Sequence, residues 1–568
     1  MKNVITNAAD ITVLRLIDNT LKTGGGPASV GATVVVASKG PVGKVVQVTD
    51  ANWQKIFGKP LNKKATGMEG LRHLADAVKE CNYVNVVRVV GADAKFPSLS
   101  IKTTDGTATA AGHVYGTALS LGVGVCLQIW PIDGDPSINR SFEIKDVVAD
   151  KSAWITATAY VVNDVITVTG GRLICTTAHT SGATAPTLAV PGSQWQVYTG
   201  KFDKRITVNL YDKDSEGVEY LLETYLVGLD PSDKDDMGRP AYIETVFEQN
   251  SERFRANWDE GVTLATARTG LKAFVKTAFT LGTNGADPTT VEWKAAWDLF
   301  RNETYLAHLM FAAGNVEADV IANCLDIASK RHVSFFFDVS PLLSAASALT
   351  WIKGLGQDQR QAAAYYSPFE ANDPFYGGKT VWGVSGEAVA ACARGDQNYS
   401  GSTPGIHYAP AGSIRARLTR TGIKPLFPEQ TINRDDFYDA RINPVVASDS
   451  GGATIDDCLA IHYRQDYSRF IWVNRIANYI DHRFYEGAAA LKFEPDGLTR
   501  TGLFKMTKQI LDELVTSGAL VTPRDPADGT APFIIKIEQV EIDLWLVTWD
   551  FCPTGAARRI AGQPRLIK

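Results

Sequence analysis

The residues best suited to chemistry in this chain surround one serine, Ser385, at the start of a predicted helix. Hydrolases that present a nucleophilic serine at a strand–helix turn carry glycine two residues before it and two residues after it. Gly383 meets the first requirement, but Glu387 occupies the second position. Asp396 and His407 could supply a carboxylate and a base, yet their spacing gives no sign of a triad. A histidine beside the Ser385 hydroxyl in the folded chain would make a catalytic serine worth considering again.

Other common signatures of catalysis and metal binding are missing from the sequence. The eight histidines are scattered, and neither an HExxH zinc motif nor a P-loop occurs. Two aspartate-rich stretches, Asp230–Asp236 and the region of Asp449, Asp456 and Asp457, lack the liganding rhythm of a calcium loop. They predict solvated loops. We therefore expect no enzyme activity, no cofactor and no metal.

Length and composition are those of an ordinary globular protein of several domains. The 568 residues are 45% hydrophobic and 21% charged, and the net charge is −5. A nearly neutral chain without a long basic run argues against a nucleic-acid partner. We see no membrane span and no signal peptide, so we expect assembly in a cytoplasm. The seven cysteines form no CxxC pair, which predicts reduced and mostly buried thiols.

The order of strand and helix patterns predicts an α/β core interrupted by an insertion. The core would occupy residues 28–94 and 241–426. Between them, residues 95–240 are rich in Thr, Ala and Gly and predict an inserted, all-β peripheral domain. Residues 427–551 predict a C-terminal α+β domain, in which a helix over 501–517 precedes a strand over 533–551.

Both ends of the chain predict extended arms with no core of their own, over residues 1–27 and 552–568. Such arms suit pairing with the sheet edge of a neighbouring subunit. The alternative is that both ends fold back on their own domain. The residues expected to pair are Ile11, Val13, Leu14 and Leu16 at one end and Arg559, Ile560, Leu566 and Ile567 at the other.

Short motifs spread across most of the chain resemble, in order, those of one protein family. The opening is similar in Lys39-Gly40-Pro41 and Ile56-Phe57-Gly58, and Leu281–Gly285 resembles a GGxDG turn with departures at Thr283 and Asn284. The remaining similar segments are Ala363–Pro368 (A-x-Y-Y-P), Ser385–Asp396 (S-G-x-V-A-G-x-x-A-R-x-D), Gly405–Gly412 (G-V-x-x-A-P-A), Arg441–Asn443 (G-I-N) and Phe493–Gly497 (F-E-P-N). Together and in this order, these segments resemble contractile bacteriophage (myovirus) tail sheath proteins. The region from about 94 to 200 lies outside the resemblance.

The resemblance implies a structural subunit that polymerises as helically stacked hexameric rings around an inner tail tube, joined by exchanged arms. Its other partners would be baseplate and tail terminator proteins. The assembled sheath would be located in the virion. Contraction would drive the tube through the host envelope for genome ejection. The sheath of an R-type bacteriocin or another contractile injection system is the alternative, and a glycan-binding tail adhesin is a rival of another class.

The same resemblance assigns roles within the C-terminal domain. The receiving sheet for the arms would be lined by Val540, Ile542, Leu544 and Leu546. The helix over 501–517 would face an acidic tube through Lys505, Lys508, Gln509 and Asp512. The alternative is that these polar residues are only the solvated face of an amphipathic helix.

Within the insertion, residues 153–198 resemble the small carbohydrate-binding modules of chitinases. The aromatic residues Trp154, Tyr160 and Trp195 could contact a surface glycan, since sugar binding needs exposed aromatic faces. Leu173 stands where such modules often have an aromatic residue. The alternative is that the three aromatic residues form the core of a decorative domain.

Overall fold

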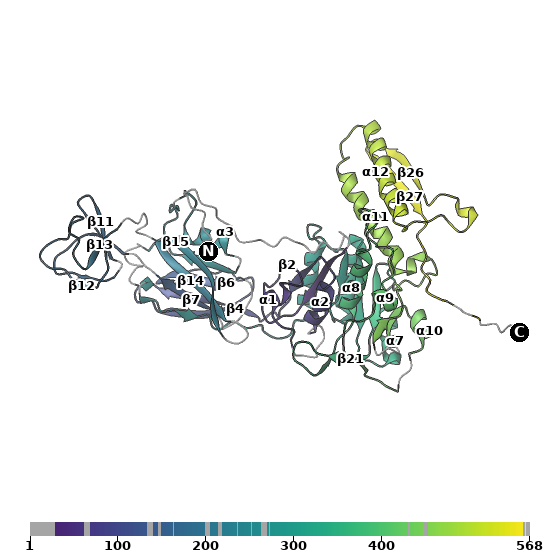
Figure 1. Cartoon of the computed structure of the whole chain (residues 1–568), viewed down its shortest axis with the longest axis horizontal. Helices are drawn as coiled ribbons and strands as arrows, with labels where there is room; N and C mark the ends of the chain where they lie inside the picture. The colour runs from purple at the N-terminus through teal and green to yellow at the C-terminus, as the bar shows by residue number, and fades with distance from the viewer. Residues whose placement is uncertain are drawn as a thin grey trace. The chain divides into compact units, whose positions relative to one another are not determined.

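A computed structural model describes residues 29–61, 69–132, 140–145, 149–162, 164–198, 205–213, 218–235, 237–251, 253–262, 270–271, 273–429, 432–447, 452–560 and 563. The chain forms two compact units. The first unit contains residues up to 37, residues 43–89 and residues 289–568, and the second contains residues 38–42 and 90–288. Figure 1 shows the elements of both units.

An eight-stranded sheet forms the centre of the first unit. Its strands, in spatial order, are β2 (Val45–Val48), β3 (Tyr83–Arg88), β1 (Val30–Val35), β18 (Leu309–Phe311), β19 (Ser334–Val339), β20 (Ala362–Tyr366), β24 (Ile442–Ala447) and β25 (Ala453–Ile455). All neighbours from β3 to β24 pair in parallel, while β2 and β25 close the edges antiparallel. Since both faces of such a sheet are covered, its strands read as continuous apolar runs, as in β19.

Helices cover the two faces of this sheet. The side chains of α2 (Gly70–Val78) and α8 (Ser385–Asp396) join the core on one face. The side chains of α5 (Thr290–Asp298), α6 (Ala318–Arg331), α7 (Ala345–Leu355) and α10 (Arg434–Asp439) join the core on the other. Smaller elements complete the unit: α1 (Trp53–Phe57), η2 (Leu299–Arg301), α9 (Gly412–Arg415), η3 (Tyr467–Arg469), η4 (Pro526–Asp528), and a sheet of β22 (Lys379–Val381), β21 (Phe369–Asn372) and β23 (Lys424–Pro425).

The last part of the first unit consists of two long helices and a hairpin. Helix α11 (Ile471–Ala489) leads to α12 (Asp496–Thr516), and the strands β26 (Phe533–Glu541) and β27 (Leu544–Phe551) pair with each other. Figure 1 shows the hairpin beside α12. The helix predicted over 501–517 corresponds to α12, which begins earlier, at Asp496; its residues Leu503, Ile510 and Leu514 are buried.

The second unit is mostly β-structure. One sheet is β16 (Phe254–Trp258), β6 (Val125–Pro131), β4 (Lys95–Lys102) and β5 (Ala108–Val114); another is β15 (Glu219–Gly228), β14 (Arg205–Lys213), β7 (Ser141–Lys145) and β17 (Thr277–Ala278). Helix α3 (Ile243–Asn250) shares a core with them. A small module contains β13 (Trp195–Val197), β11 (Gly171–Cys175), β10 (Asp164–Val168) and β8 (Ala149–Ala153), beside the pair β12 (His179–Thr180) and β9 (Ala159–Tyr160).

Two expected domain boundaries differ from the observed pairing. The sequence predicted a return to the α/β core at residue 241, but β16 pairs with β6 and the second unit continues to residue 288. The sequence also placed residues 427–551 in one C-terminal domain, whereas β24 pairs with β20 in the core sheet. In both cases the deciding contact joins strands far apart in the chain, which local patterns do not report.

Six of the seven cysteines are buried, Cys552 is partly exposed, and all are free thiols in the described structure. Among the helices of the described ranges, none has both the length and the apolar content that a bilayer span requires.

Candidate functional site

The predicted single strand over 533–551 is wrong: this segment is a β-hairpin. Phe533 pairs with Phe551 and Glu538 with Leu546, and the chain reverses between Glu541 and Leu544. A register shift between Gln539 and Glu541 leaves Val540 as the extra residue of a bulge. The turn escaped prediction because the apolar alternation runs through it without a glycine or asparagine.

The inner face of the hairpin is anchored on the helices. Phe533, Ile535, Trp549 and Phe551 are partly buried against a cluster that contains Ile510, Leu511 and Leu514 of α12. The ring of Trp549 lies 4.8 Å from that of Phe484 of α11, centroid to centroid. Alternation along each strand therefore sends every second side chain to the helices and the others outward.

The outer face of the hairpin consists of the side chains that point away from the helices: Ile534, Lys536, Glu538, Leu544, Leu546, Thr548 and Asp550. Leu544 and Leu546 are each 49% exposed. Ile542, in the turn, is 91% exposed. Within the described residues the sheet has two strands, so each strand has one edge without a strand partner. Exposed apolar side chains beside open strand edges are the features that favour strand addition.

All four residues predicted to receive the arms are exposed, but they do not lie on one strand. Leu544 and Leu546 belong to the outer face, Val540 to the bulge and Ile542 to the turn. Sequence reasoning missed Ile534, which is also exposed on the outer face.

Of the predicted arms, only the start of the C-terminal one lies within the described residues. Thr554 accepts a hydrogen bond from the Trp472 indole (3.2 Å), and Arg558 forms an ion pair with Asp457. Beyond this tie, Ile560 is 88% exposed. Ile11, Val13, Leu14, Leu16, Leu566 and Ile567 lie outside the described residues.

The predicted tube-facing residues line a shallow groove between α12 and the loop of Ser400–Thr403. All four are exposed. Lys508 forms an ion pair with Asp512 one turn later, so much of its charge is already compensated. Gln509 donates to Glu513 (3.0 Å). Lys505 is exposed and forms no ion pair within the described residues.

A histidine does lie beside Ser385, but the arrangement is not a triad. His73 Nδ1 is 3.1 Å from the Ser385 hydroxyl and 3.7 Å from the Asp338 carboxylate, so both partners meet the same ring nitrogen. In a triad the serine and the carboxylate engage opposite nitrogens. Asp338 also accepts the N–H groups of Val384 (2.6 Å) and Ser385, which caps α8.

The three residues are sealed inside the core, with at most 1% of any of them exposed. Burial lowers the pKa of His73 to about 4, so the ring is neutral near pH 7. Gly386 lets the helices approach closely, because a Cβ there would lie 2.1 Å from the His73 carbonyl oxygen. The cluster therefore positions α8 against α2 and the sheet. The other posed partners lie elsewhere: Asp396 holds Arg475 (2.6 Å), and His407 stacks on Tyr408.

In the small module, Tyr160 and Trp195 are in the core and only Trp154 is partly exposed. Tyr160 and Trp195 meet edge to face with 5.1 Å between centroids. Their faces are therefore covered, and glycan contact through this set would depend on Trp154.

Comparisons with known proteins return structural likenesses of low sequence identity. No family model matches the chain, and no curated protein matches it. The chain is similar to the sheath tail protein of Desulfitobacterium hafniense, with 10% identity over 92% of this chain and 96% of that one and a TM-score of 0.47. It is also similar to a chain of the anti-feeding prophage baseplate (15% identity, 51% and 76% covered, TM-score 0.37). A third is a chain of an extracellular contractile injection system, the PVC sheath complex in the contracted state (16% identity, 46% and 70% covered, TM-score 0.37).

Proposed function

We propose that this chain is the structural subunit of a contractile sheath and that the β26–β27 hairpin accepts extended arms from neighbouring subunits. The observation that carries the proposal is the hairpin itself. Its inner face is anchored on α11 and α12, while its outer face is apolar at Leu544 and Leu546 beside two open edges. A two-stranded sheet is marginal by itself, and added strands would satisfy its free backbone groups.

The exchange of arms between subunits would explain how the subunits form a helical polymer. A segment of one subunit that pairs with a different surface on the next makes a heterologous contact, and such contacts that do not close generate helices. The arms at residues 1–27 and 552–568 would connect each subunit to its neighbours in and between hexameric rings. The ordered sheath-like motifs, from Lys39-Gly40-Pro41 to Phe493–Gly497, support this function independently of the hairpin.

Contraction would then be a change of packing between subunits that stay joined by their arms. Alternative packings that differ by a few kcal/mol per subunit suffice, because a long stack multiplies the difference. The extended form would be kinetically trapped until the baseplate releases it. We place the inner tube against α12, with Lys505 as its main contact, since weak and screened charge contacts can break during contraction.

The test is electron microscopy of the purified full-length protein beside a variant that lacks residues 561–568. This deletion keeps Arg558 and its ion pair with Asp457, so the fold of the unit is spared. Tubes or stacked rings from the full chain, lost in the deletion, are the expected result. Monodisperse monomers from both proteins at high concentration, with tube protein added, would contradict the proposal.

A phage tail sheath, located in the virion, is our preferred form of this function. A bacteriocin or other injector would use the same subunit architecture, and capsid genes beside the coding sequence distinguish the two. The adhesin alternative loses support because Tyr160 and Trp195 are covered in the module core.

A further inference from the structure

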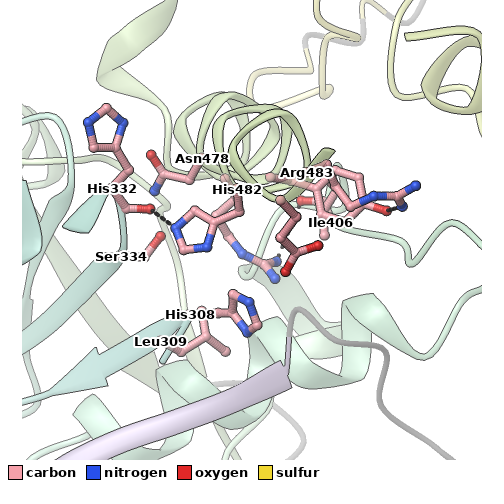
Figure 2. A pocket seen from close by; sticks show the side chains of 11 residues that line it. His308, Leu309, His332, Ser334, Ile406, Asn478, His482 and Arg483 are labelled. Carbon is pink, nitrogen blue, oxygen red and sulfur yellow. Dashed lines mark hydrogen bonds between the residues drawn. The ribbon is translucent and has the colours of Figure 1, made fainter. Parts of the chain in front are cut away.

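A small cavity lies where α11 leaves the α/β core of the first unit. Its volume is about 80 Å³, and it is lined by His308 before β18, His332 at the end of α6, and Asn478 and His482 of α11. Figure 2 shows the rings of His308 and His482 facing one another across it. Their centroids are 5.4 Å apart. Histidine and asparagine side chains therefore lie at this joint between helix and sheet.

His482 fastens the helix to the core through its ring. Its Nε2 lies 3.0 Å from the carbonyl oxygens of both Arg331 and His332. Because a carbonyl only accepts, Nε2 carries the proton. One residue earlier on α11, Asp481 accepts from His332 Nδ1 at 2.6 Å. These contacts join the end of α6 to the middle of α11.

The ring of His308 has a nitrogen atom that forms no hydrogen bond at this joint within the described residues. Its Nδ1 is shielded from solvent and has no hydrogen-bond partner among the described residues, and the same holds for both amide atoms of Asn478. A cavity of this size admits about two water molecules, which is enough for a proton to reach the ring.

The charges around His308 oppose its protonation. Burial lowers its pKa to about 3, and His482, Arg475 and Arg331 act in the same direction. The nearby carboxylates are engaged or exposed. The charged and titratable groups of the surrounding elements are Glu303; Arg331 and His332 of α6; Asp396 of α8, which holds Arg475; Asp481, His482, Arg483 and Glu486 of α11; and Glu513 of α12, which holds Arg483.

We propose that His308 and His482 form an acid-sensitive latch that holds the second half of α11, residues 481–489, against the core, and that protonation opens it. The first half of α11 would stay in place, because Ile471–Ile480 is largely buried and Arg475 is held by Asp396. The second half is only partly buried. The inference concerns the subunit alone and does not depend on sheath assembly.

The direction of the effect follows from proton binding. The closed latch keeps His308 neutral, whereas the open latch raises the pKa of His308 toward its ordinary value of 6.5. The closed state is therefore fully favoured above pH 6.5 and loses stability as pH falls toward 3. At pH 5 the difference corresponds to at most about 30-fold more opening than at pH 8.

Hydrogen exchange of the full chain at pH 8 and pH 5, expressed as protection factors, tests the latch. We expect protection of residues 481–489 to fall by up to about 30-fold at pH 5 while protection of β19 is kept. His308→Gln should reduce the pH effect at residues 481–489 to below about twofold. His113→Gln, which alters a histidine of the second unit, should leave the effect unchanged.

Two results would overturn the latch. One is a wild-type chain in which residues 481–489 lose no protection at pH 5, or lose it only together with β19, which would indicate global acid unfolding. The other is an undiminished pH effect in His308→Gln. If that variant does not fold, the wild-type comparison of residues 481–489 with β19 decides by itself.

Discussion

The core sheet and the β26–β27 hairpin cover their strands in opposite ways. In the core, helices lie on both faces, and all six residues of β19 are buried. In the hairpin, one face meets the helices and the other presents Leu544 and Leu546 to solvent. Burial on both faces favours a stable scaffold, whereas an open face and open edges favour association.

The core and the hairpin also differ in the kind of side chain whose removal matters. The core encloses charges that are paired, such as Arg475 with Asp396 and Arg420 with Asp76. The hairpin instead exposes the apolar side chains of Leu544 and Leu546. A buried charge without its partner is costly to the fold, while an exposed leucine costs the monomer little. The difference implies that substitutions in the core change folding, and substitutions on the outer face of the hairpin change assembly.

The largest loss of stability is expected from Arg475→Leu. The substitution leaves the Asp396 carboxylate buried without its guanidinium partner, which lies 2.6 Å away. We expect the free energy of unfolding to fall by about 3–5 kcal/mol, measured by urea denaturation. Arg301→Leu is the matched control, because its ion pairs with Asp298 and Asp326 are exposed and should contribute under about 1 kcal/mol. Equal losses in the free energy of unfolding of the two variants would contradict a special role for buried ion pairs in the core.

Acid should weaken the core through His73. Its pKa is lowered from 6.5 to about 4 by burial, so the folded state binds fewer protons than the unfolded state between these values. The stabilisation is complete above pH 6.5 and is lost as pH falls to about 4, by about 3 kcal/mol.

The comparison that isolates this effect is wild type against His73→Gln, by urea denaturation at pH 7.5 and 4.5. The wild type should lose more stability than the variant on acidification. Glu69 has the opposite slope, because burial raises its pKa to about 8, but it is common to both proteins and cancels. Parallel losses would show that His73 does not titrate as described.

Ser385→Ala should cost about 1 kcal/mol, which is the net value of one buried hydrogen bond to His73. A purely structural serine predicts no other change, so assembly seen by electron microscopy should be normal. A variant of full stability that fails to assemble would assign Ser385 a role beyond packing.

The smallest change in stability, and the clearest loss of assembly, is expected from Leu544→Ser with Leu546→Ser. Both side chains are half exposed, so the free energy of unfolding should change by less than about 0.5 kcal/mol. Tubes should nevertheless be absent in electron micrographs. Lys536→Ser with Thr548→Ser, a pair on the same outer face, is the control that should still assemble. Tubes from the leucine variant would remove the outer face from the proposed interface.

Several features of this protein could be determined from its sequence alone. The order of strand and helix patterns indicated an α/β core with an inserted β-rich region, and the amphipathic pattern over 501–517 indicated a helix with one covered face, in which Leu503, Ile510 and Leu514 are buried. Both are local patterns, since the period of apolar residues reports which face of an element is covered. The alternation around Leu544 and Leu546 likewise indicated a strand with an apolar face.

Only the tertiary structure decided which elements meet. The turn at Ile542 and Asp543 has no sequence signal. The sequence analysis therefore predicted one strand over 533–551, where the structure has a hairpin. Helix α8 brings Ser385 to His73, 312 residues away in the chain, and α11 carries His482 to His308. Periodicity encodes a covered face but not its partner, because the partner is selected by packing between segments that are remote in sequence.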